Sequence, residues 1–74
     1  MSRLLVEAGE ALYGPRWQSE LARALGVNER TVRRWATGEL SPRPGIYLDA
    51  LKLTQERAAV LDALRARLRA AAAG

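Results

Sequence analysis

Residues 18–37, QSELARALGVNERTVRRWAT, constrain the fold of this chain more than any other stretch. Gly26 lies where a left-handed residue would end one helix, and Asn28 is a good N-cap for the next. Apolar residues recur at helical spacing on both sides of this turn: Leu21, Ala22, Leu25, Val32 and Trp35. The pattern predicts two short helices, joined by a tight turn, that pack through these apolar positions.

The sequence before these two helices predicts another helix at the start of the chain. Ser2 is a candidate N-cap, and apolar residues follow on one face: Leu4, Leu5, Ala8, Leu12 and Tyr13. Gly14 and Pro15 end this helix because Gly-Pro is a turn signal. Pro15 either opens the next helix or lies in the connection.

The segment after the pair predicts two more helices. Gly38 is the expected C-cap, and residues 39–45 contain two prolines and one glycine, which favours an extended loop. A fourth helix is expected over residues 46–53, and Thr54 is read as the cap of a fifth over residues 54–72. The expected fold is therefore all-α, a bundle of about five helices around a mostly aliphatic core. We expect residues 1–74 to form one domain with its core in residues 1–53.

Composition narrows the possible functions. The chain has no Cys and no His, so it lacks a thiol nucleophile, an imidazole base and the usual zinc ligands. No paired-carboxylate site or phosphate-binding loop is visible either, and we expect no enzyme activity, no cofactor and no metal. No apolar run is long enough for a membrane span or a signal peptide, which predicts a cytoplasmic protein.

Charge is unevenly distributed along the chain. The formal net charge is +4, and residues 14–45 carry six bases and three acids. Four charged residues fall on or near the outer face of the second helix of the pair: Glu29, Arg30, Arg33 and Arg34. A basic cluster on one helix is the electrostatic pattern of a nucleic-acid-binding surface.

The spacing of the pair resembles the helix-turn-helix of the phage-repressor and Cro-like family of DNA-binding regulators. The resemblance rests on Gln18, Glu20-Leu21-Ala22, Leu25-Gly26-Val27, Val32 and Trp35, and the loop Ser41–Pro44 with the helix after it adds to it. It implies a lambda-repressor-like fold in which the helix over residues 29–37 enters the major groove of double-stranded DNA.

The resemblance also implies site residues. The expected base contacts are Glu29, Arg30, Arg33 and Arg34, and the expected backbone contacts are Gln18, Ser19, Asn28, Thr37 and Arg43. Glu29 either accepts from a cytosine amine or pairs with Arg33 at i+4. Trp17 is either a core residue or an aromatic beside the DNA backbone, and Tyr47 either packs or donates to a phosphate.

The last helix has two readings. Its apolar positions are Val60, Leu61, Leu64 and Leu68. They either cover the domain's own core or form the interface of a homodimer, which we favour. The whole pattern predicts a homodimeric repressor of the autorepressor type that reads an inverted repeat. The alternative is a protein-interaction or antitoxin-like adaptor module that uses the helix-turn-helix surface or this last helix.

Overall fold

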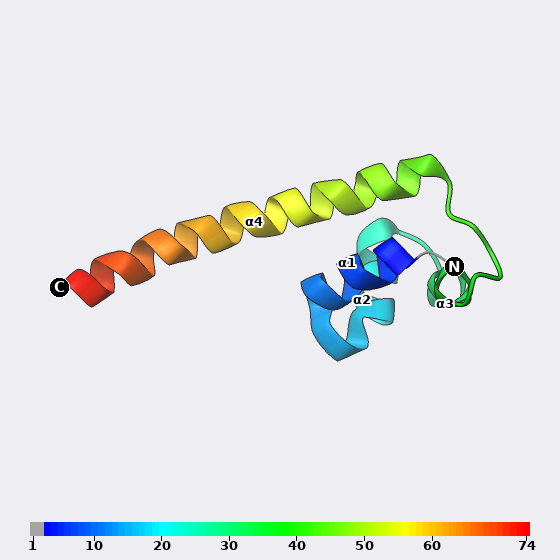
Figure 1. Cartoon of the computed structure of the whole chain (residues 1–74), viewed down its shortest axis with the longest axis horizontal. Helices are drawn as coiled ribbons and strands as arrows, with labels where there is room; N and C mark the ends of the chain where they lie inside the picture. The colour runs from blue at the N-terminus through cyan, green and yellow to red at the C-terminus, as the bar shows by residue number, and fades with distance from the viewer. Residues whose placement is uncertain (1–2) are drawn as a thin grey trace.

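The computed structural model describes residues 3–74, which form helices and no strand. Figure 1 shows the elements in chain order: α1 (Arg3–Tyr13), the 3₁₀ turn η1 (Gly14–Arg16), α2 (Trp17–Leu25), α3 (Glu29–Thr37) and α4 (Pro44–Ala73). The all-α prediction is confirmed. The expected cap at Ser2 lies outside the described residues.

Glycines end the first three helices. Gly14, Gly26 and Gly38 all have positive φ values, which L side chains adopt at a cost. At Gly26 the backbone N–H groups turn back onto the last turn of α2, and the amide of Val27 donates to the carbonyl of Ala22 at 3.0 Å. The helix stops read from the glycines were therefore correct.

The first connection is tighter than the sequence indicated. Pro15 lies inside η1 and does not open an α-helix, and α2 begins at Trp17, one residue earlier than the pattern placed it. Trp17 is 8% exposed and belongs to the core. The core reading of Trp17 is therefore the right one.

The core is formed where α1, α2, α3 and the first turns of α4 meet. Its buried members are Leu5, Trp17, Leu21, Ala22, Val32, Trp35 and Ala50. Leu21 and Val32 are the most completely buried large side chains, which places the α2–α3 contact at the centre of the domain. Leu4 was expected on this inner face but is 64% exposed, because the α1 face that packs inward is centred on Leu5, Gly9 and Leu12.

The prediction of separate fourth and fifth helices is wrong, since residues 44–73 form one continuous helix, α4. Thr54 caps nothing: its hydroxyl donates to the carbonyl of Leu51 at 2.7 Å, one turn back in the same helix. Neither Gly nor Pro occurs between Ile46 and Ala73, so nothing interrupts the run of strong helix formers. Within residues 3–74 there are four α-helices and one 3₁₀ turn instead of the expected five helices.

Only the first half of α4 packs on the other helices. Figure 1 shows α4 running past α1 and α2 and ending far from them. Thirty residues at 1.5 Å per residue make a rod of about 45 Å. The molecule measures 52 × 23 × 19 Å, and this rod accounts for the longest of the three dimensions. We call residues 58–73 the distal half of α4, and α1–α3 with residues 44–57 the body.

Candidate nucleic-acid interface

The angle between α2 and α3 is fixed by buried residues and caps. Leu21 and Ala22 of α2 pack with Val32 and Trp35 of α3, and all four are buried. The side chain of Asn28 accepts from the amide of Arg30 at 2.8 Å and starts α3. Each side of the turn is therefore held by its own local interaction, so α3 is presented as a rigid rod.

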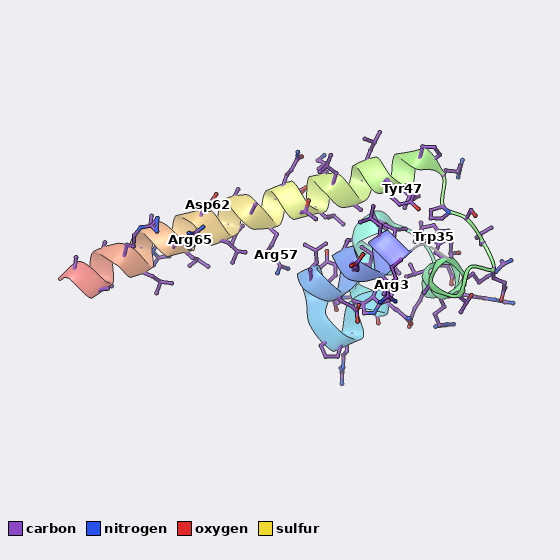
Figure 2. The ribbon with its side chains drawn as sticks, viewed as in Figure 1. Arg3, Trp35, Tyr47, Arg57, Asp62 and Arg65 are labelled. Atoms are coloured by element: carbon purple, nitrogen blue, oxygen red, sulfur yellow. The ribbon has the colours of Figure 1, made fainter. Side chains whose placement is uncertain are left out.

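One side of α3 is buried and the other is charged. Val32 and Trp35 face the core, and Trp35 points inward from α3 in Figure 2. The four expected base-contacting residues are all exposed: Glu29, Arg30, Arg33 and Arg34. The structure therefore brings together the cluster that the sequence predicted.

Ion pairs divide the α3 arginines into two kinds. Arg33 lies 3.2 Å from Glu29, and Nε of Arg34 donates to Glu39 at 2.8 Å. Among the described residues Arg30 has no carboxylate within 4 Å. In the single chain the carboxylate of Glu29 is therefore paired with Arg33 at i+4, which is one of the two arrangements expected for it.

These two ion pairs are weak, so the arginines remain able to exchange partners. All four partners are between 44% and 64% exposed, and exposed ion pairs contribute about 0 to 1 kcal/mol. A phosphate can therefore replace either carboxylate at small cost. Arg30 needs no such exchange and is the guanidinium most ready to meet an anion or a base edge.

The expected backbone contacts lie around this helix in three groups. Gln18 and Ser19 are in the first turn of α2 and are half-buried, while Arg43 is exposed at the N-cap position of α4. Asn28 and Thr37 are exposed, but both have local partners: Asn28 caps α3, and the Thr37 hydroxyl donates to the carbonyl of Arg34 at 3.2 Å. The last two therefore shape the ends of α3.

Arg16 is a candidate that the sequence reasoning missed. A shallow hollow lies at the start of α2 and is lined by Pro15, Arg16, Trp17, Gln18, Ser19 and Glu29. The unpaired amides of a helix N-terminus and a guanidinium both favour an anion. The signal available in the sequence is an arginine two residues before Gln18.

The expected dimer positions on α4 are exposed in the single chain. Val60, Leu61, Leu64 and Leu68 are 43–67% exposed and do not cover the chain's own core. Arg57 points from α4 toward α1 in Figure 2, and its guanidinium lies 5.8 Å from the ring centroid of Tyr13. Val60 still lines a hollow with Leu12 and Tyr13. The body therefore ends near Val60, and the three leucines beyond it are left exposed.

Within residues 3–74 no three His, Cys, Asp or Glu side chains gather as metal ligands. Nor does any helix of that part of the chain have the length and apolar character to cross a membrane.

Comparison of the chain with protein-family models, curated proteins and solved structures finds no significant match.

Proposed function

We propose that this chain is a sequence-specific transcriptional regulator that binds double-stranded DNA through α3. In this proposal it acts as a homodimeric repressor, of the autorepressor type, on an inverted-repeat operator. The resemblance of residues 18–37 to the phage-repressor helix-turn-helix supports the proposal. In a regulator of this kind the fold is lambda-repressor-like.

The observation that carries it is the two-sided character of α3. One side is fixed to the core by Val32 and Trp35, and the other exposes three arginines and one glutamate. A helix with its side chains is about 10–12 Å across, and the major groove of B-DNA is about 12 Å wide. The charged side of α3 therefore has the size and sign to enter that groove.

The free guanidinium of Arg30 is our candidate for base reading. A bidentate contact from Arg to O6 and N7 of guanine contributes about 1–3 kcal/mol of discrimination. Arg33 and Arg34 reach a base or a phosphate by leaving Glu29 and Glu39. Gln18, Ser19 and Arg16 at the start of α2 then face the adjacent backbone, where amide groups favour phosphate.

The test is a mobility-shift assay with DNA from upstream of the chain's own gene. Arg30→Ala should weaken binding to the preferred duplex by roughly tenfold to a hundredfold. Arg23→Ala is the matched control, because Arg23 is an exposed arginine of α2 outside the candidate interface. Equal and weak binding of the unaltered protein to every duplex would refute sequence-specific recognition.

The alternative function, a protein-interaction or antitoxin-like adaptor, is supported by the exposed apolar residues on α4. It predicts the opposite effects of the substitutions on α3 and α4. In an adaptor, Arg30→Ala with Arg34→Ala leaves function intact, and Leu64→Asp or Leu68→Asp abolishes it. In a regulator the arginine changes abolish DNA binding even while the dimer persists.

A further inference from the structure

A second exposed apolar surface lies on the body, away from α3. It is an open groove between α1 and α4, lined by Leu4, Leu5, Ala8, Tyr47, Ala50, Leu51 and Thr54. Leu4 and Leu51 are 64% and 51% exposed. We call this the apolar groove. It has no part in the proposed contact with DNA.

The apolar groove and the distal half of α4 belong to one continuous face of that helix. Starting at Tyr47, steps of four and three residues pass through Leu51, Thr54, Ala58, Leu61 and Leu68. Such spacing keeps residues on one face of a helix and is the spacing of a coiled-coil seam. The exception is Arg65, between Leu61 and Leu68. We call this face the α4 seam.

We propose that a second copy of the chain covers this face, with the two α4 helices antiparallel. The distal half of each α4 then lies against the apolar groove of the other copy. This inference takes up the homodimer of the proposed function but does not depend on DNA binding.

The seam matches itself in one antiparallel register. Leu51 meets Leu68 of the second copy, Ala58 meets Leu61, Tyr47 meets Ala72, and Thr54 meets Arg65. Three of these four layers are apolar, and two pair a large side chain with an alanine, which lets the helices approach closely. In the fourth layer the charged residue Arg65 lies against the hydroxyl residue Thr54. Every contact occurs twice, as a two-fold interface requires.

The same register brings the distal half beside α1. A two-fold axis normal to the plane of the two helices leaves both bodies on one side of that plane. Leu4 and Ala8 of α1 line the groove next to Leu51. In this register Leu68 of the second copy lies opposite Leu51 and its Leu64 lies opposite position 55, so these two leucines are nearest to Leu4 and Ala8. The same contact therefore buries the apolar groove and three leucines of the distal half: Leu61, Leu64 and Leu68.

Charge favours this pairing over one between the two distal halves alone. After Asp62 the chain has three arginines and no acid, and α1 has Glu7 and Glu10 against one base, Arg3. Asp62 and Arg65 are labelled on the distal half in Figure 2, well away from the body. Stacking two distal halves on each other would bring six arginines together, whereas the proposed register sets a basic segment beside an acidic helix.

Cross-linking tests the register directly, because the chain has no cysteine of its own. Leu51→Cys and Leu68→Cys proteins are mixed, equilibrated and treated with a short bismaleimide. We expect a 51–68 cross-link between copies, identified by peptide mass spectrometry. Leu64→Cys alone should not cross-link to itself, because its two copies lie about 13 Å apart along the helix axis in this register. A 64–64 cross-link with no 51–68 product would overturn the proposal.

A substitution on α1 tests the groove without touching α4. Leu4→Arg places a charge at an exposed position, so the body should fold as before by circular dichroism. Sedimentation equilibrium should show the dimer dissociation constant rising roughly tenfold or more. Ala63→Arg, on the opposite face of α4, is the control for the added charge and should change that constant by less than about twofold. A monomeric unaltered protein, or a dimer indifferent to Leu4→Arg, would refute the pairing. DNA binding by such a protein would leave the proposed recognition of DNA by α3 standing.

Discussion

Gly9→Ala should destabilise this protein, although glycine is a poor residue inside a helix. Alanine is favoured over glycine in helices by about 1 kcal/mol, so the swap ordinarily stabilises. At Gly9, however, an added Cβ would lie 2.9 Å from Cδ2 of Trp17 and closer still to its Cε3 atom. Carbon atoms in contact prefer about 3.5–4.0 Å, so the indole ring must move.

The ring has little room to move, because Trp17 is 8% exposed and packs in the central cluster with Leu5 and Leu21. Overpacking a core costs about 1–3 kcal/mol, and a rigid indole against a helix backbone belongs at the upper end of that range. After subtracting the gain in helix propensity of about 1 kcal/mol, we expect Gly9→Ala to lower the free energy of unfolding by about 2 kcal/mol.

The matched control is Gly45→Ala in the first turn of α4, where an added Cβ meets nothing within 4 Å. This swap should be neutral or stabilise by about 0.5 kcal/mol, since position 45 is near a helix end. Urea unfolding followed by circular dichroism, at one protein concentration, measures both variants. If Gly9→Ala is as stable as Gly45→Ala, the close approach of α1 to Trp17 is wrong.

Three further predictions concern the turn and the DNA contact. Because the side chain of Asn28 caps α3, Asn28→Ala should lower the free energy of unfolding by about 1 kcal/mol in the same urea assay. Asn28→Ser keeps a capping oxygen and should retain most of that stability. Gly26→Ala should cost about 1 kcal/mol, because its φ of 69° is unfavourable for a residue with a Cβ; a neutral result would contradict the left-handed turn. For a phosphate contact from Arg43, Arg43→Ala should reduce the slope of log affinity against log salt by about 0.9 in a fluorescence-anisotropy titration. An unchanged slope would remove Arg43 from the interface.

Local signals in the sequence predicted the first half of the fold well. Gly26 and Gly38 end helices because their φ values are positive, and Asn28 caps because its side chain reaches the amide two residues on. These features depend on one or two neighbouring residues. The same is true of the inner positions of α2 and α3, which follow helical periodicity.

The sequence was misleading where a residue has more than one local role. Threonine is a good N-cap, but the Thr54 hydroxyl also bonds back into its own helix, and strong helix formers on both sides decide the outcome. Leu4 and Leu5 are adjacent and equally apolar, and only the packing direction of α1 decides which is buried. The Arg34–Glu39 pair joins a helix to a loop, so no helical spacing predicts it.

The distal half of α4 has a consequence for local stability. From Leu61 onward every residue is exposed, so this segment is held only by its own backbone hydrogen bonds and by the helix propensity of Ala, Leu and Arg. Isolated helices of this length are marginal in water. Amide hydrogens of residues 61–73 should therefore exchange with solvent quickly in dilute protein, even while the amides of α2 and α3 remain protected. If a second molecule covers this segment, the exchange of these amides should slow as the protein concentration rises.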